Sequence, residues 1–200
     1  IGLSSSPYTY FMLASDYGKV GVNYFHGFIE SIYDNVNRYI NGRGVEINNN
    51  KSFSAGISEI IIYSGKNRSV DLGYINPLAS HLEVELNDRL NFPGTNNSNA
   101  VWQFHLDWLL LKSIRFSINY LYDEYVFDQT VQKGKEHGRA YSWKIACPII
   151  NNSYRILNLH FSHIMIGTPT FRHGNGANNF VNGEKSMGWE YGSDGEEVSM

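Results

Sequence analysis

The chain of 200 residues has little charge, a single cysteine and no long apolar run. Charged residues make up 18% of it, below the roughly 25% of typical soluble chains. No stretch of ~18 apolar residues could cross a bilayer as a helix, and no N-terminal stretch has the pattern of a signal peptide. Cys147 has no second cysteine to pair with, and its alternating surroundings indicate a small apolar strand residue.

An excess of charge of one sign is also missing. The formal net charge is -3, and no Lys- or Arg-rich stripe is present, so we expect no nucleic-acid partner. The sequence begins at Ile1 without an initiator methionine. We therefore expect a fragment of a longer protein, from which any signal peptide is missing.

Aromatic residues are abundant, at 14% of the chain, and most of them are Tyr or Phe. Residues 102–111, WQFHLDWLLL, show how they are arranged. Successive side chains of a strand point to opposite faces, so this segment would separate an aromatic row from a polar row. The aromatic row is Trp102, Phe104, Leu106, Trp108 and Leu110, and the polar row is Gln103, His105 and Asp107.

The same two-residue period recurs along the chain and predicts an all-β fold. Residues 48–52, NNNKS, predict a hairpin, because Asn tolerates the positive backbone dihedrals of a tight turn. Only Lys112 and Ser113 separate two of the runs, which should therefore be antiparallel neighbours. The predicted strands lie at 19–33, 43–48, 53–63, 102–111, 114–125, 141–149 and 154–165.

A loop and helix insertion is expected at about 66–92, where the alternation stops. Asn76 and Pro77 resemble a helix cap and a first-turn proline, and leucines follow at helical spacing. We predict one short helix from Pro77 to about Leu86. No long repeat or linker divides the chain, so residues 1–200 are expected to form one β domain.

The aromatic faces could contact either lipid or a protein core. Transmembrane strands need ~9–11 residues, whereas the strands of a β-sandwich commonly have about 5–6. The predicted runs are nearer the first length, and short turns mix with long polar connections. The pattern thus favours an antiparallel transmembrane β-barrel of outer-membrane type, with a soluble β-sandwich as the alternative. Residues near strand ends that would suit an aromatic girdle are Trp102, Tyr120, Tyr122, Tyr141 and Tyr154.

Five motifs occur in an order that matches one known family. They are RYINGRGVE at 38–46, SEIIIYSGKNR at 58–68, GYINPL at 73–78, INYLYDEYVFDQ at 118–129 and GEKSMGWEYGSDGEEV at 183–198. Together they resemble the Wzi-like capsule-assembly family of outer-membrane β-barrel proteins. Two positions depart from the family's pattern. Either Gly44 replaces the arginine that follows Gly-His, or Arg43 is that arginine and the histidine is lost, and Ser64 replaces the first glycine of its Tyr-Gly-Gly.

The resemblance implies a fold and a function. The fold would be part of a larger, monomeric barrel in the bacterial outer membrane, surrounded by outer-membrane lipid. The function would be assembly or surface attachment of capsular polysaccharide or exopolysaccharide, lectin-like and non-catalytic, without a cofactor. A porin-like transport barrel and a β-rich carbohydrate hydrolase are the two alternatives.

Two groups of polar residues are candidates for roles in such a barrel. Unpaired charges are costly to bury, so we expect the charged residues of the strands to form a network inside the barrel. That network would contain Arg43, Glu46, Glu59, His105, Asp107, Arg115, Asp123 and Lys144. Polar loop residues would contact sugar hydroxyls. The loop candidates are Arg68, Asn76, Arg172 and Asp194.

Catalytic and metal sites have weaker support in the sequence. His160 and His163 would point to opposite sides of a strand, so they do not predict a metal pair. Asp123 and Glu124 also diverge in a strand and cannot alone form the carboxylate pair of a glycosidase. The acidic stretch at 192–200 lacks the spacing of a calcium loop. We expect no catalytic residues and no metal ligands.

Overall fold

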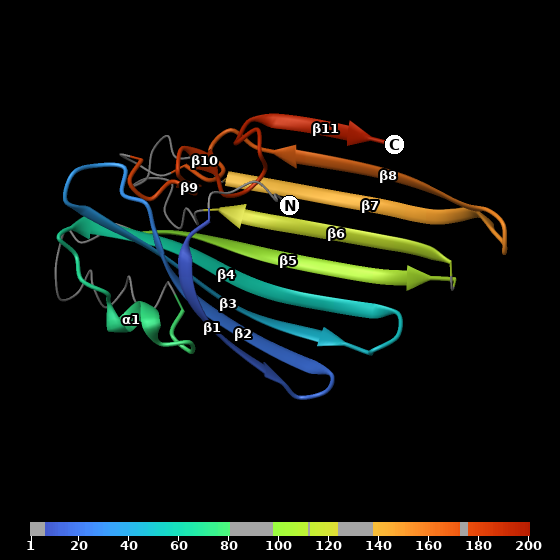
Figure 1. Ribbon diagram of the computed structural model, residues 1–200, viewed down its shortest axis with the longest axis horizontal. Helices are drawn as coiled ribbons and strands as arrows, with labels where there is room; N and C mark the ends of the chain where they lie inside the picture. The colour runs from blue at the N-terminus through green and yellow to red at the C-terminus, as the bar shows by residue number, and fades with distance from the viewer. Residues whose placement is uncertain (1–6, 81–97, 112, 124–137, 173–175) are drawn as a thin grey trace, which may run out of the picture.

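The computed structural model describes residues 7–80, 98–111, 113–123, 138–172 and 176–200. They form one sheet of nine strands in which every neighbouring pair is antiparallel (Figure 1). The prediction of an all-β antiparallel fold is confirmed. In sheet order, the strands are β1 (Thr9–Asp16), β2 (Val20–Ile29), β3 (Val36–Asn48), β4 (Phe53–Lys66), β5 (Ser98–Leu110), β6 (Ile114–Asp123), β7 (Gly138–Asn151), β8 (Ile156–Ile166) and β11 (Gly195–Ser199).

The sheet is open within the part of the chain that the structure describes. Its edge strands, β1 and β11, are each paired on one side only and not with each other. The structure therefore confirms the antiparallel sheet and does not itself close it into a barrel.

Each of the seven predicted runs overlaps a strand, from β2 to β8. Residues 30–33 and 154–155 of two runs lie outside their strands, and 124–125 lie outside the described residues. Alternation does not predict β1, because its residues from Tyr10 to Leu13 are all apolar and show no two-residue period. It also misses β11, which has only five residues, and the small hairpin of β9 (Val181–Asn182) and β10 (Lys185–Ser186). These strands are too short for a periodic signal.

The connections differ between the two ends of the sheet. The ends of β1, β3, β5 and β7 that lead into short connections lie at one end of the sheet, and the ends of β2, β4, β6 and β8 that lead into the connections at 30–35, 67–97, 124–137 and 167–194 lie at the other (Figure 1). The predicted hairpin at 48–52 is confirmed. Asn50 has a φ of 56°, and the side-chain oxygen of Asn49 accepts the backbone N–H groups of Lys51, Ser52 and Phe53.

The helix lies earlier in the chain than predicted. Helix α1 (Leu72–Ile75) begins after Asp71, whose carboxylate accepts the backbone N–H of Gly73 as an N-cap. Asn76 caps the C-terminal end, and Pro77 follows the helix instead of starting it. The prediction of a helix from Pro77 is thus wrong for residues 77–80, which form a turn, and its remainder lies outside the described residues. Among the described residues no helix is long and apolar enough to cross a membrane.

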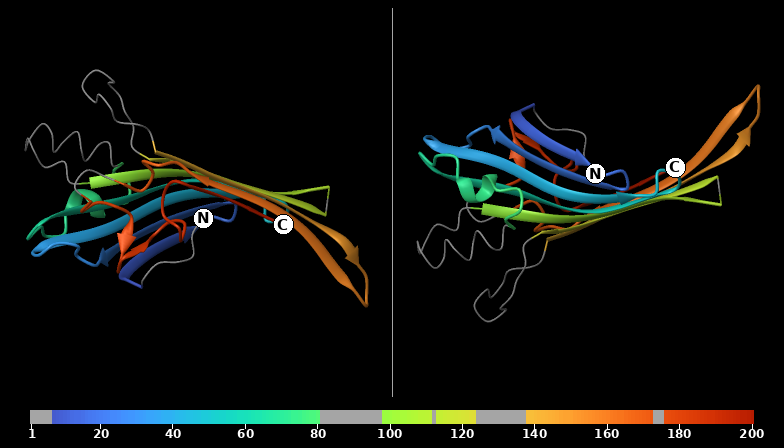
Figure 2. Two further views of the ribbon diagram at one scale, coloured as in Figure 1. Left: turned by 90° about the horizontal axis from the view of Figure 1, so that it is seen from above. Right: turned by 90° about the horizontal axis from the view of Figure 1, so that it is seen from below.

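Separate segments cover the two faces of the sheet near the long connections (Figure 2). We call the face with Trp102 and Phe104 the aromatic face and the face with Gln103 and His105 the polar face. Tyr74 of α1 packs on the aromatic face. The strap, by which we mean residues 167–172 and 176–194, packs on the polar face through three aromatic side chains: Phe171, Phe180 and Trp189.

Candidate functional site

From β3 to β8 the aromatic face is mainly apolar and is exposed toward the end with the short turns. His163 on β8 is an exception, and its Nε2 atom lies 2.6 Å from Oε1 of Glu196 on β11. Strand register sets apolar side chains next to one another in rows that cross the sheet. One row contains Phe53, Trp108, Phe116, Ile145 and Phe161, from β4 to β8. A second contains Val45, Ile57, Phe104, Tyr120, Tyr141 and Met165. A third contains Ile47, Ala55, Leu106, Ile118 and Trp143. We call these three rows the apolar belt.

The apolar belt is a surface and not a core. Phe104 is 49% exposed and Trp108 is 45% exposed, and none of the belt residues is buried. The apolar side chains of β5 on this face extend from Trp102 to Leu110, about 27 Å at roughly 3.4 Å per residue. That length is close to the apolar band of about 25 Å on outer-membrane barrels.

The polar face behind the belt carries a ladder of hydrogen bonds. Arg115 Nε donates to Asp107 Oδ1 at 2.9 Å, and Ser117 Oγ donates to Asp107 Oδ2 at 2.7 Å. Asn119 accepts from Gln103 Nε2 at 3.2 Å. These bonds join β5 to β6. Those from Arg115 and Ser117 satisfy the carboxylate of Asp107, one of the residues predicted to form an interior network.

Six of the eight predicted network residues lie on the polar face. His105 Nε2 is 3.0 Å from Glu46 Oε2, and Lys144 lies opposite Ser117 in the register. Asp123 is 1% exposed at the other end of this face, where it accepts the backbone N–H of Phe171 in the strap. The structure thus brings together two side-chain pairs, Glu46 with His105 and Asp107 with Arg115, and sets Lys144 and Asp123 apart from them.

Arg43 and Glu59 lie on the aromatic face, which corrects the expectation that they belong to the same network. Their Nε and Oε2 atoms are 3.3 Å apart, and Glu59 is 2% exposed. Arg43 Nη1 also donates to the backbone oxygen of Asn76 at 3.1 Å. The sequence held the signal for this placement, because Arg43 is two residues from Val45 and Glu59 is two residues from Ile57.

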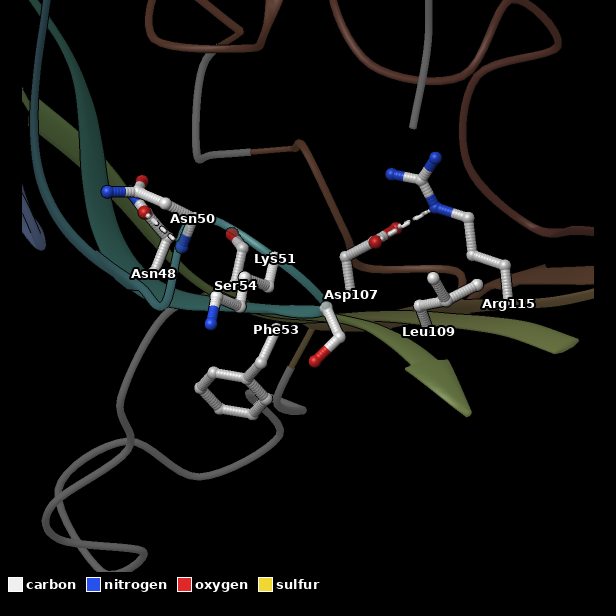
Figure 3. Close-up of a pocket in the computed structure, with 9 residues that line it drawn as sticks. Asn48, Asn50, Lys51, Phe53, Ser54, Asp107, Leu109 and Arg115 are labelled. Carbon is white, nitrogen blue, oxygen red and sulfur yellow. Dashed lines mark hydrogen bonds and ion pairs between the residues drawn. The ribbon is translucent and has the colours of Figure 1, made fainter. Parts of the chain in front are cut away.

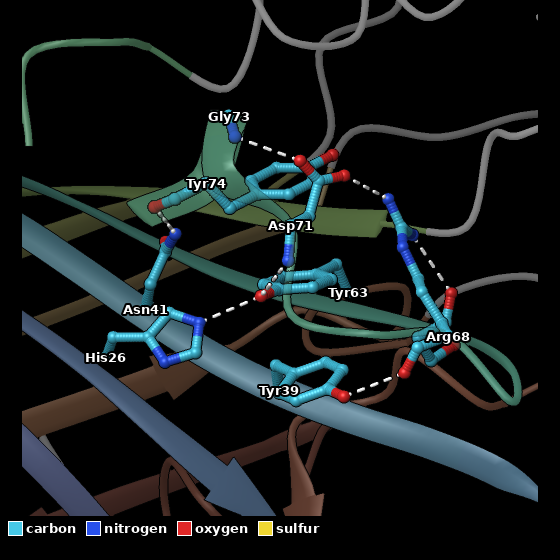
Figure 4. A network of polar contacts seen from close by, with 9 residues as sticks. His26, Tyr39, Asn41, Tyr63, Arg68, Asp71, Gly73 and Tyr74 are labelled. Atoms are coloured by element: carbon cyan, nitrogen blue, oxygen red, sulfur yellow. Dashed lines mark hydrogen bonds and ion pairs between the residues drawn. The ribbon is translucent and has the colours of Figure 1, made fainter. Parts of the chain in front are cut away.

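A stack of three tyrosines fixes the connection after β4 to the aromatic face (Figure 4). The ring centroids are 4.9 Å apart between Tyr39 and Tyr63, and 4.3 Å apart between Tyr63 and Tyr74. His26 Nε2 lies 2.8 Å from the Tyr63 hydroxyl, and Asn41 Nδ2 donates to the Tyr74 backbone oxygen at 2.6 Å. Sequence reasoning missed this cluster, since its members lie far apart in the chain.

Two of the loop candidates have structural partners in this region. Arg68 donates to the Ser64 backbone oxygen at 3.0 Å and to Asp71 Oδ2 at 2.9 Å, and its guanidinium lies over the Tyr63 ring at 5.0 Å. Asn76 caps α1, and its side-chain oxygen accepts the backbone N–H of Leu78. Both residues therefore help to hold the connection in place.

The other two loop candidates, Arg172 and Asp194, are exposed on the strap. Asp194 Oδ1 accepts from the Thr168 hydroxyl at 2.8 Å, which ties the two ends of the strap together. All four loop candidates lie at the long-connection end. However, Arg68 and Asn76 are on the aromatic side of the sheet, whereas Arg172 and Asp194 are on the polar side.

A buried arginine anchors the strap. Arg38 is 2% exposed, and its guanidinium donates to the backbone oxygens of Ala177 at 2.6 Å, Glu30 at 2.7 Å and Asn179 at 2.8 Å. The planar fork of arginine suits several acceptors at fixed positions. The strap is consequently fastened over one end of the polar face, a feature that no sequence pattern predicted.

Two hollows lie on the sheet. One, of about 300 Å³, is open and polar and lies at the turn between β3 and β4, where Lys51, Asp107 and Arg115 are among its lining residues (Figure 3). The second, of about 420 Å³, lies on the aromatic face below residues 77–80. Within the described ranges, no group of three or more His, Cys, Asp or Glu could hold a metal ion.

Comparison with known proteins adds no relative, since no protein-family model, no curated protein and no solved structure matches the chain.

Proposed function

We propose that this chain is the membrane-embedded sheet of an outer-membrane β-barrel protein that holds capsular polysaccharide or exopolysaccharide at the cell surface without catalysing a reaction. The observation that carries the proposal is the exposed apolar belt, which lies directly behind a polar face. A soluble sheet of this size would bury its aromatic face, whereas a barrel presents that face to lipid.

The asymmetry of the connections supports the same proposal. Outer-membrane barrels have short turns on the periplasmic side and longer loops on the outer side. The short turns of this sheet at 17–19, 49–52, 111–113 and 152–155 all lie at one end. We place the other end, with the strap and α1, toward the cell exterior.

The polar face fits an aqueous interior better than a lipid surface. Its polar pairs, Glu46 with His105 and Asp107 with Arg115, would be costly to expose to hydrocarbon. The strap covers the outer end of this face through Phe171, Phe180 and Trp189. A covered end favours a role in attachment over free diffusion of solutes.

The polysaccharide role rests on the motifs in the sequence and on the exposed side chains at the outer end. Arg172 and Asp194 are exposed on the strap and could bond to sugar hydroxyls, whereas Arg68 and Asn76 are engaged in holding the loop after β4. A polymer with many repeats can gain avidity from individually weak contacts. We therefore assign the polysaccharide contact chiefly to the strap.

The first experiment tests the membrane location. Cells that produce the full-length protein are fractionated into soluble, inner-membrane and outer-membrane pools, and the migration of the protein is compared with and without heating. We expect outer-membrane recovery and a heat-dependent shift in migration. Recovery in the soluble pool would make the aromatic face a protein contact and overturn the proposal.

A second experiment tests the role in surface attachment. We expect the double variant Arg172→Ala/Asp194→Ala to release polysaccharide into the medium while the barrel still assembles. Lys51→Ala, at the short-turn end, is the control and should retain polysaccharide as the wild type does. Equal retention by the double variant and the control would contradict the assignment to the strap.

A further inference from the structure

The hollow on the aromatic face is a groove that crosses the strands. It encloses about 420 Å³, within the range of roughly 300–1,000 Å³ for small-molecule sites. Its lining residues come from β1, β2, β3, β4 and β5, so it lies across the sheet and not along one strand. With strands about 4.8 Å apart, this path is about 19 Å long. The groove is therefore long and narrow.

Two neighbouring rows of the strand register form the floor of the groove. In the first row, Val45 lies between Val22 and Ile57. These three aliphatic side chains are 44%, 38% and 38% exposed, respectively. In the second row, Arg43 lies beside Glu59, which is 2% exposed. The accessible part of the floor is thus hydrocarbon, and the ion pair is covered.

The roof of the groove is also apolar. Pro77 and Leu78 follow α1 and line the groove from above, and Leu78 is 90% exposed. Trp102 on β5 closes one end, and Leu13 on β1 lies at the other. Apolar side chains therefore line the floor, the roof and both ends of the groove, and the remaining lining residues include the small polar Ser15, Asn23, Ser58 and Ser80.

We propose that this groove binds one acyl chain of a membrane lipid. The inference rests on the proposed function, because Val45 and Ile57 belong both to the groove and to the apolar belt, so the groove is continuous with the surface assigned to lipid. An acyl chain needs no hydrogen-bond partners, which matches an apolar floor. A sugar would lose water from its hydroxyls without gaining acceptors there.

One pair of variants separates the groove from the rest of the belt. Val45→Phe adds volume inside the groove, whereas Ile47→Phe adds the same kind of ring two residues away on the same face, outside the groove. Both positions are exposed, at 44% and 50%, so both variants should fold. The full-length protein is purified in detergent, stripped of loosely held lipid and examined by native mass spectrometry.

We expect the wild type and Ile47→Phe to retain a bound lipid, and Val45→Phe to lose it. Equal retention by the two variants would show that any lipid is held by the belt in general, and this would overturn the inference. A wild-type protein that partitions into membranes but retains no lipid would also overturn it, while leaving the proposed function intact.

A second measurement does not depend on a membrane. A fatty acid brominated on its chain quenches the fluorescence of an indole that it contacts, and Trp102 lines the groove. The quenching that depends on Trp102 is the difference between a protein that contains Trp102 and the same protein with Trp102→Phe. We expect this quenching to persist when Ile47→Phe is introduced and to disappear when Val45→Phe is introduced. If the protein is soluble, the proposed function fails, and this assay still decides whether the groove takes an acyl chain. Absence of quenching at Trp102 would contradict the proposal.

Discussion

His105 on β5 reaches across β4 to Glu46 on β3, with 3.0 Å between its Nε2 atom and Oε2 of Glu46. Gly56 lies opposite both residues in the strand register and makes this contact possible. A Cβ atom on Gly56 would be 2.5 Å from Cε1 of His105 and 2.7 Å from the Val45 backbone oxygen. The contact between His105 and Glu46 therefore depends on the absence of a side chain at Gly56 between them.

Gly56→Ala should lower the free energy of unfolding by about 1–3 kcal/mol, because the methyl group would displace the His105 ring and crowd the backbone of β3. Gly21→Ala is the matched control, since a Cβ atom there would meet nothing within 4 Å. Denaturant unfolding of both variants in detergent measures the difference. Equal stability of the two variants would show that the contact between His105 and Glu46 does not constrain the sheet.

Glu59→Gln should destabilise the protein by about 3–5 kcal/mol, because it leaves the Arg43 charge without its partner in a largely buried position. The double variant Arg43→Gln/Glu59→Gln removes both charges and should lose less stability than the single variant. Unfolding midpoints of the single and double variants test this order. A double variant that is less stable than Glu59→Gln would contradict the proposed pairing.

Arg38→Lys should loosen the strap, because an ammonium group cannot reach the three backbone oxygens that the guanidinium contacts. A loss of about 3 kcal/mol is expected from the missing charged hydrogen bonds, and it should appear as faster proteolysis within residues 176–194. Arg155→Lys, at the exposed turn between β7 and β8, is the control. Identical cleavage rates in the two variants would show that Arg38 does not anchor the strap.

Phe104→Lys should reduce assembly in the membrane, because it places a charge in the apolar belt at a cost of about 2–4 kcal/mol near the middle of a bilayer. Ser54→Lys is the control, since it lies on the polar face opposite Asp107, where a positive charge has a partner. Heat-dependent gel migration of membrane fractions measures assembly. Assembly of Phe104→Lys at the level of Ser54→Lys would contradict the assignment of the apolar belt to lipid.

The alternation of side chains predicted the central strands, since the contrast between polar and apolar neighbours is local. The run at 102–111 contains β5 from Trp102 onward, the run at 114–125 contains all of β6, and the short connection between them does make these strands neighbours. Strand β1 gave no such contrast, because apolar residues follow one another from Tyr10 to Leu13. The helix prediction relied on Asn76 and Pro77 as a start signal, whereas α1 begins at the Asp71 cap, six residues before the proline.

The candidate site was predictable only in part. The alternation of side chains along a strand correctly placed His105 and Asp107 on one face. The same rule places Arg43 with Val45 on the opposite face. The partners across strands depend on register, so the contact from His105 over Gly56 to Glu46 required the assembled sheet. Arg68 looked like a free loop residue, but its position over the Tyr63 ring gives it a structural role.

The sequence by itself determined that the chain forms long antiparallel strands with one aromatic and one polar face, because both properties follow from the two-residue period of extended backbone. Only the tertiary structure decided which segments cover those faces. Arg38 fastens the strap to the polar face, and Tyr74 seats α1 on the aromatic face, through contacts between residues far apart in the chain. Such contacts depend on packing and on the geometry of hydrogen bonds in the folded sheet, which no local pattern encodes.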